Sequence, residues 1–280
     1  MIEKLSKHAV LYRVDGDTDE GKALAKKAHL QGYPTTILYR NAGDEIDRYI
    51  GYAGRSDYIK TIMGYFMGVD TLEDLKGRSG QEADPELLMR ISSKLQERGG
   101  YEPSLGWIEK ARQVEGEKGR ELMEKLELLE GTALLHTELE RGEQILERLA
   151  MHAETERVGK EAFYSLSRFF RKNDRTDSLL ELYHALLSNR QDDPSFLNGY
   201  AWFCAEKEVD LEKALAAARR AVLISDEDPG ILDTLAEVYY KMGDSEEAIV
   251  AIDKALLKEP DDEYLKEQRK KFLGHGKKET

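Results

Sequence analysis

The residue types that most often carry chemistry are few in this 280-residue sequence, and their spacing favours no particular reaction. One cysteine is present, Cys204, which excludes a disulfide or a CxxC pair within the sequence itself. The histidines lie far apart, without the spacing of metal ligands, and are typical of solvated helix surfaces. They are His8, His29, His136, His152, His184 and His275. We therefore expect no catalytic residue, no metal site and no cofactor.

Neighbouring acids can serve as a general acid and a general base, and Glu138 and Glu140 stand close enough in sequence to be considered. Runs of this kind more often lie on a solvated helix face. Cys204 falls on the apolar side of a helical pattern, so we expect a small buried packing residue and not a reactive thiol. We expect Trp107 and Trp202 to be packing or groove residues. A hydrolase or metalloenzyme is disfavoured, because no constellation of His, Cys or Ser is present.

The charge balance narrows the class of partner. With 42 basic and 55 acidic residues, the formal net charge is −13, and basic residues form only short runs such as Lys277–Lys278. Nucleic acid is disfavoured as a partner, because phosphate binding needs clustered Lys and Arg. No apolar run approaches the ~20 residues needed to span a bilayer.

The strongest pattern lies at residues 229–262, which predict two short helices closed by a turn. Small and large apolar residues recur there at fixed offsets, as helices that approach closely require. The spacing resembles one tetratricopeptide repeat, whose signature is W-x-x-L-G-x-x-Y, then A-x-x-x-F, then P over about 34 residues. The matching structural positions are Leu232, Leu235, Ala236, Tyr239, Ala248, Ile252, Ala255 and Pro260.

Similar but looser offsets extend back along the chain and predict an all-α solenoid over residues 84–276, made of about five helical hairpins. Pro194 and Pro229 mark equivalent hairpin starts, and Asp84–Pro85 has the favoured cap-then-proline order. A charged helix at 263–272 is suited to capping the stack. A plain helical bundle is the alternative, which the recurring offsets disfavour. The resemblance implies a protein or peptide ligand on the concave face.

Residues 1–66 differ in sequence pattern from the rest of the chain and predict a β-α-β-β-α order. We expect a strand at 9–14, a helix at 19–29 capped by Thr18, strands at 35–39 and 45–50 joined by a turn at 41–44, and a helix capped by Ser56. Over residues 9–62 this order, with Gly32-Tyr33-Pro34-Thr35, resembles the C-terminal half of a thioredoxin fold. The resemblance implies a cis bond between Tyr33 and Pro34. It also marks Tyr33, Pro34 and Thr35 as the loop that meets a substrate strand.

The departure from that family is the segment that would carry CxxC, which has no counterpart in the sequence. Residues 1–7 resemble the tail of the helix that follows CxxC, so we expect the redox motif of the parent protein to lie upstream of Met1. Without that segment three strands remain, and the sheet lacks the interior strand that would lie between two of them. This half-domain is expected to be the least stable part of the chain unless the strand at 9–14 pairs with the strand at 35–39. Residues 67–83 are expected to hold a connecting helix and a polar linker around 76–80.

Two hypotheses for the function follow. The first is a partner-binding scaffold, thioredoxin-like and with tetratricopeptide repeats, derived from a thiol–disulfide oxidoreductase. The alternative is a purely non-catalytic scaffold in which residues 1–66 are a structural cap. In either case this chain should not catalyse exchange, because no thiolate nucleophile is available outside the packed helix of Cys204. A cytoplasmic location is expected if Met1 is the true start, and a periplasmic or secreted one if a signal and CxxC precede it.

Overall fold

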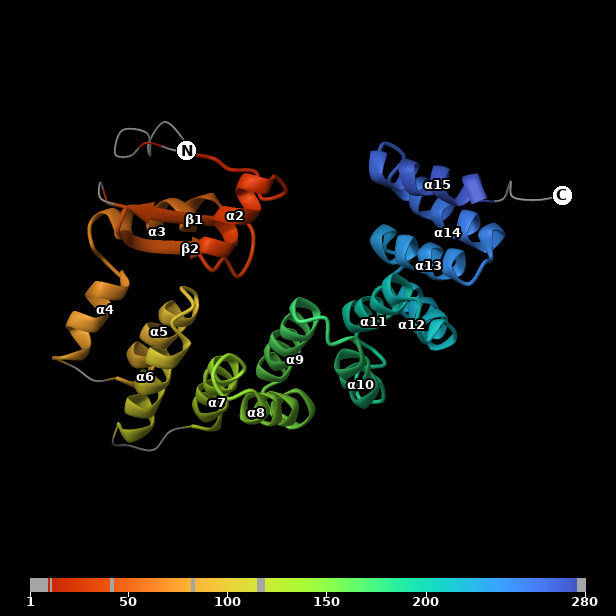
Figure 1. Cartoon of the computed structure of the whole chain (residues 1–280). Coiled ribbons are helices and arrows are strands. Elements are labelled where there is room, and N and C mark those ends of the chain that lie inside the picture. The colour runs from red at the N-terminus through yellow and green to blue at the C-terminus, as the bar shows by residue number, and fades with distance from the viewer. Residues whose placement is uncertain (1–9, 11, 41–42, 82–83, 115–118, 276–280) are drawn as a thin grey trace. The chain divides into compact units, whose positions relative to one another are not determined.

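The computed structural model describes residues 10, 12–40, 43–81, 84–114 and 119–275 (Figure 1). The chain divides into two compact units, residues 1–166 and residues 167–280. The described part is mostly helical, with two short strands near its start. We take each unit by itself.

The first unit opens with a small α/β segment. Its elements are α2 (Asp19–Lys27), β1 (Thr35–Tyr39), β2 (Glu45–Ile50) and α3 (Arg55–Phe66). Thr18 caps α2 as predicted, because its Oγ1 accepts a hydrogen bond from the Gly21 N–H at 3.0 Å. Strands β1 and β2 are antiparallel, with Thr36 opposite Tyr49 and a register irregularity at Leu38/Tyr39. Residues 41–42 of the predicted turn lie outside the described residues.

Two predictions for this segment are wrong. In the described part of residues 9–14 there is no strand, and Val10 and Tyr12 are 97% and 76% exposed. An apolar run becomes a strand only when a neighbour pairs with its backbone, and the described strands β1 and β2 pair with each other. A thioredoxin-like domain is therefore not confirmed. Helix α3 begins at Arg55, after Gly54 at φ 106°, so Ser56 lies inside the helix and is not its cap. Residues 1–7 lie outside the described residues.

Helices complete the first unit. They are α4 (Leu72–Ser79), α5 (Pro85–Gln96), α6 (Tyr101–Gln113), α7 (Arg120–Leu134), α8 (Leu139–His152) and the first part of α9 (Glu156–Lys172). The stretch 76–79 that reads as linker is the last turn of α4. Thr71 caps α4, and Leu75 is fully buried in one apolar cluster with Leu88 and Ile91 of α5. This helix therefore belongs to the helical core.

The second unit holds the rest of α9 and the helices that match the repeat pattern best. They are α10 (Thr176–Leu187), α11 (Pro194–Lys207), α12 (Leu211–Ile224), α13 (Pro229–Lys241), α14 (Ser245–Lys258) and α15 (Glu263–His275). Helices α11 and α13 each begin at proline after an aspartate whose side chain accepts backbone N–H bonds, Asp193 and Asp228. Fully buried alanines such as Ala218 and Ala248 let paired helices approach closely.

Candidate functional site

Helix α13 is the most enclosed helix described in the second unit. It packs against α11, α12, α14 and α15 (Figure 1), and every residue from 231 to 239 is buried. A helix of a solenoid shows this pattern when repeats lie on both sides of it. The buried stretch includes polar residues, Asp233, Thr234 and Glu237, which the repeat signature did not single out.

The residues assigned to the repeat signature occupy the interior of this unit. Those at 9% exposure or less are Leu232, Leu235, Ala236, Tyr239, Ala248, Ile252 and Ala255. Pro260 is exposed in the turn after α14. Cys204 is fully buried, and burial raises the pKa of its thiol to about 11. The prediction of a buried packing cysteine is therefore confirmed.

Two acids lie one helical turn apart on the side of α13 that faces α15. The Tyr264 hydroxyl donates to Asp233 Oδ2 at 3.1 Å, and Lys271 Nζ donates to Glu237 Oε2 at 2.5 Å. Asp233 Oδ1 is buried and has no hydrogen-bond partner among the described residues. Burial, together with the nearby Glu237 charge, raises the pKa of Asp233 to about 6.

Helix α11 presents an equivalent face. Asn198 follows Leu197 just as Asp233 follows Leu232, and its Oδ1 is also buried without a hydrogen-bond partner in the described part of the chain. One turn further on, Trp202 is 37% exposed. At the end of the helix, Arg171 pairs with Glu206 at 3.1 Å. Trp202 is therefore the exposed aromatic ring of this helix, and aromatic residues are enriched at protein contact surfaces.

In the first unit, the loop before β1 holds the other predicted site residues. The Tyr33–Pro34 bond is cis, so that prediction is confirmed. Tyr33 is 65% exposed and Pro34 is also exposed, whereas Thr35 is half-buried. The Thr35 hydroxyl donates to the Gly32 carbonyl at 2.6 Å. The Tyr33 ring lies close to Gly16, where an added Cβ would be 2.9 Å from it.

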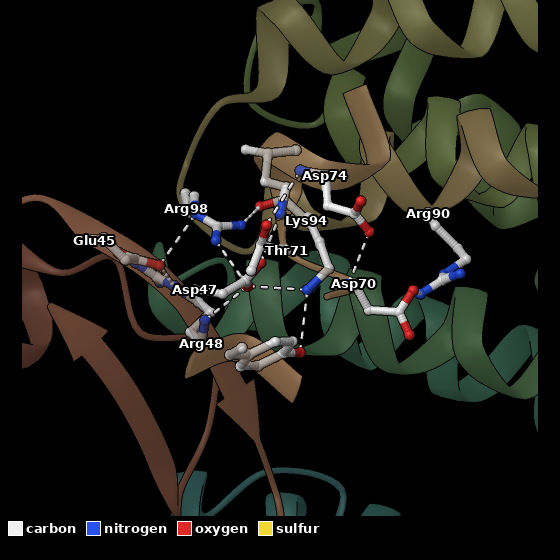
Figure 2. A network of polar contacts seen from close by, with 11 residues as sticks. Glu45, Asp47, Arg48, Asp70, Thr71, Asp74, Arg90, Lys94 and Arg98 are labelled. Carbon is white, nitrogen blue, oxygen red and sulfur yellow. Dashed lines mark hydrogen bonds and ion pairs between the residues drawn. The ribbon is translucent and has the colours of Figure 1, made fainter. Parts of the chain in front are cut away.

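A polar network that the sequence did not predict lies behind this loop, around the fully buried Asp47 of β2 (Figure 2). Asp47 accepts hydrogen bonds from its neighbour Arg48 N at 2.7 Å, from Leu72 N at 2.7 Å and from Lys94 Nζ at 2.9 Å. Arg98 Nη2 lies 2.8 Å from Asp47 Oδ1, as an ion pair without hydrogen-bond geometry. One carboxylate therefore joins β2, the start of α4 and helix α5. We call these five residues the Asp47 network.

Arg48, the next residue of β2, is 4% exposed and makes a second set of contacts. Its Nη1 donates to the carbonyl oxygens of Ala28 at 2.8 Å and Glu97 at 2.7 Å, and Nε and Nη2 both bond to Glu45. Burial opposes the charge, but the hydrogen bonds and charge of Glu45 outweigh it and raise the pKa of Arg48. The planar guanidinium suits this role, because it can serve several acceptors at fixed angles.

Near the Asp47 network lies a more exposed group of ion pairs, of which Figure 2 draws Asp70 and Arg90. Asp70 pairs with Arg90 at 3.0 Å and with Arg78 at 3.3 Å. Burial opposes ionisation of Asp70, but the hydrogen bond and charge of Arg90 outweigh it and lower the pKa. These side chains are about half exposed, so each pair contributes little to stability. The Asp47 network is therefore a structural junction between β2, α4 and α5, and it offers no open site.

One pocket in the first unit has a volume of about 210 Å³ and lies among α6, α7 and the start of α8. Its charged lining residues are already paired with one another. Arg112 pairs with Glu130, and Arg141 pairs with Glu138. We therefore assign no ligand to it. Among the described residues no group of three or more His, Cys, Asp or Glu could hold a metal ion.

Comparison with known proteins supports the helical part of this description. Residues 205–269, from the end of α11 into α15, match the family model of the tetratricopeptide repeat. The chain therefore carries tetratricopeptide repeats, in agreement with the packing of α11 to α15. No helix in the described part of the chain is long and apolar enough to cross a membrane.

Solved structures of repeat proteins resemble this chain at low sequence identity. YrrB, a TPR protein with an unusual peptide-binding site, is 17% identical, with a TM-score of 0.46 over 71% of this chain and 99% of that chain. MamA from Desulfovibrio magneticus RS-1 is 17% identical, with a TM-score of 0.45 over 65% and 98%. A thermophilic TPR protein of Thermus thermophilus is 22% identical, with a TM-score of 0.36 over 68% and 98%.

One curated protein shares a short stretch of sequence. A protein disulfide-isomerase of Hordeum vulgare is 39% identical over 66 residues, which are 21% of this chain. The match spans 13% of the length of that isomerase.

Proposed function

We propose that this protein is a non-catalytic scaffold that binds a protein or peptide on the concave face of its repeats, formed by their first helices. The observation that carries the proposal is the exposed Trp202 of α11, a helix whose other aromatic side chains are buried. Aromatic residues are enriched in protein interfaces, and a ring that the fold leaves 37% exposed is available to a partner. The match of residues 205–269 to the tetratricopeptide repeat supports the same class of partner.

The test uses the two tryptophans of the chain. Trp107→Phe leaves Trp202 as the single indole reporter, and peptides selected on the full chain are then titrated against it. Partner binding is expected to shift the Trp202 emission. Trp202→Ala removes this reporter, so its binding is measured by fluorescence anisotropy of the labelled peptide, and it should be weaker by about tenfold or more, as for an interface hot spot. Leu257→Ser is the matched control, because Leu257 is 84% exposed on α14, a second helix of a repeat. Equal loss in both variants would contradict the proposed face.

A second candidate function rests on the Tyr33–Pro34–Thr35 loop. Its cis bond, the exposed Tyr33 ring and the short match to a protein disulfide-isomerase support an origin in a thiol–disulfide oxidoreductase. In that origin the loop meets an extended substrate strand. This chain itself should show no dithiol exchange in an insulin-reduction assay, because its single thiol is buried. Activity of the chain would overturn that conclusion, and an in-frame CxxC upstream would support the origin.

A further inference from the structure

Helix α15 lies on α13 and α14 by a defined set of contacts. Leu265 and Phe272, seven residues apart, are 3% and 0% exposed, so they are the apolar anchors of the helix. Arg269 Nε pairs with Asp253 of α14 at 2.5 Å. Together with the bonds from Lys271 to Glu237 and from Tyr264 to Asp233 on α13, these contacts form an acidic and apolar surface beneath the helix. We call it the α15-binding face, and its acids are Asp233, Glu237 and Asp253.

The fit between α15 and this face is incomplete at one point. Glu237 and Asp253 each have a cation from α15, whereas Asp233 has the neutral hydroxyl of Tyr264 and no ion pair among the described residues. Asp233 is 6% exposed, and its Oδ1 has no hydrogen-bond donor in the described part of the chain. A buried carboxylate with an unfilled oxygen opposes the docking that buries it. Helix α15 therefore bonds one oxygen of this carboxylate and leaves the other unfilled.

We propose that the α15-binding face is a docking site for an amphipathic, basic helix of a partner protein, and that α15 occupies it as an intramolecular substitute. The proposal rests on the scaffold function above and gives the partner a chemistry. The partner helix carries two apolar residues seven positions apart, a cation over Glu237, and Arg or Lys where α15 has Tyr264. That cation fills Asp233 Oδ1, which is the one contact that α15 lacks.

The energetics permit such an exchange. A tethered helix competes at an effective concentration of roughly millimolar, so a free helix with the same contacts would not displace it. A hydrogen bond from a charged donor to a buried acceptor is worth enough to tighten binding by about tenfold or more. The unfilled acceptor therefore gives a basic partner an advantage over α15. The three acids of the face and the net charge of −13 favour a cationic partner in the same direction.

Two synthetic helices test the proposal against the full chain. One copies residues 262–275, and the other differs by Tyr264→Arg. We expect the Tyr264→Arg peptide to bind about tenfold or more tightly than the unchanged copy in fluorescence anisotropy, and to raise amide hydrogen exchange in α15 while α11 and α12 stay protected. Equal affinity of the two peptides, or binding that leaves α15 protected, would overturn the proposal.

Variants of the full chain make the test independent of the peptides. Tyr264→Arg in the chain itself should slow amide exchange in α15 and reduce peptide binding, because the substitute then makes the missing contact. Tyr264→Phe is the matched control. It should neither slow amide exchange in α15 nor reduce peptide binding. Asp233→Asn should abolish the preference for the Tyr264→Arg peptide, because it removes the charge that selects a cation. A retained preference in Asp233→Asn would overturn the proposal.

The result for the α15-binding face can be told apart from the result for the proposed scaffold function. A peptide that shifts Trp202 emission and leaves α15 protected supports binding at α11 and overturns docking on the α15-binding face. A peptide that displaces α15 without changing Trp202 supports the docking site and overturns the α11 face as the place of binding.

Discussion

Asp47 and Asp233 are both buried carboxylates, one in each unit, and their surroundings differ sharply. Asp47 accepts two backbone and one ammonium hydrogen bond and pairs with Arg98 besides. Asp233 accepts one bond from a neutral hydroxyl and leaves its second oxygen unfilled. The first arrangement compensates the loss of water around the charge, and the second does not. The burial of the charge is therefore compensated at Asp47 and left uncompensated at Asp233.

The contrast suggests how to separate structural from functional charges in this molecule. A buried acid with all its acceptors filled by the chain stabilises one arrangement of elements, as Asp47 does for β2, α4 and α5. A buried acid that the chain leaves unfilled is retained at a cost in stability, and such costs tend to gather at functional sites. The variants below test this distinction, beginning with the largest expected effect.

Asp47→Ala should cause the largest loss of stability, because it leaves the charge of Lys94 buried without an ion-pair partner and removes one of the two acids paired with Arg98. Breaking one side of a buried ion pair costs about 3–5 kcal/mol in free energy of unfolding. Urea denaturation followed by circular dichroism measures the effect. Asp44→Ala is the control, because Asp44 is exposed in the loop before β2. A loss below about 1 kcal/mol would remove the distinction between the two acids.

Arg48→Lys should give the next largest loss in free energy of unfolding. A lysine keeps the charge but cannot serve Glu45 and the two carbonyl oxygens of Ala28 and Glu97 at once. Two unfilled carbonyls should cost about 2–3 kcal/mol of unfolding free energy, by the same denaturation measurement. If the variant is as stable as the parent chain, the junction depends on charge alone and not on the geometry of the guanidinium.

How far these features follow from the sequence differs between the units. The buried residues of the last full repeat, from Leu232 to Ala255, were predicted because the 3.6-residue period fixes which side of a helix faces its neighbour. The Asp-Pro helix starts follow from local chemistry in the same way. Asp47 and Lys94 are 47 positions apart, and no local rule joins them. Charged residues on a short strand and a helix are ordinarily expected to be solvated.

The errors have related causes. The polar composition of residues 76–79 suggests a linker, yet a cap at Thr71 and the burial of Leu75 make that stretch part of α4. The apolar run at 9–14 suggests a strand, but a strand also needs a partner, which composition does not reveal. On the candidate faces, the packing cysteine was predicted and the unfilled oxygens of Asn198 and Asp233 were not. Satisfaction of an acceptor depends on residues from other helices.

Asp233→Asn should stabilise the second unit near neutral pH, opposite in sign to any change at Asp47. Its pKa is about 6 in the folded chain against 3.8 for an unperturbed aspartate. The folded state therefore favours the protonated form of Asp233. The stability that this protonation contributes is complete below about pH 4 and is lost as the pH rises through about 6. At about pH 7.5 the variant should be more stable by about 2 kcal/mol, and at about pH 4 the difference should vanish. Urea titrations at the two pH values measure it, and destabilisation at both would contradict the account.

Glu124→Gln should give the smallest effect and sharpen the comparison, because Glu124 is a third buried acid with a different kind of partner. It is 9% exposed, and its two oxygens accept the backbone N–H groups of Glu154 at 2.8 Å and Thr155 at 3.1 Å, just before α9. Glutamine keeps one acceptor and places an amide N–H against the other donor, so a loss of about 1 kcal/mol is expected. A gain in stability would group Glu124 with Asp233, whereas a loss near that of Asp47→Ala would show that filled acceptors stabilise the fold whether their donors are side chains or backbone.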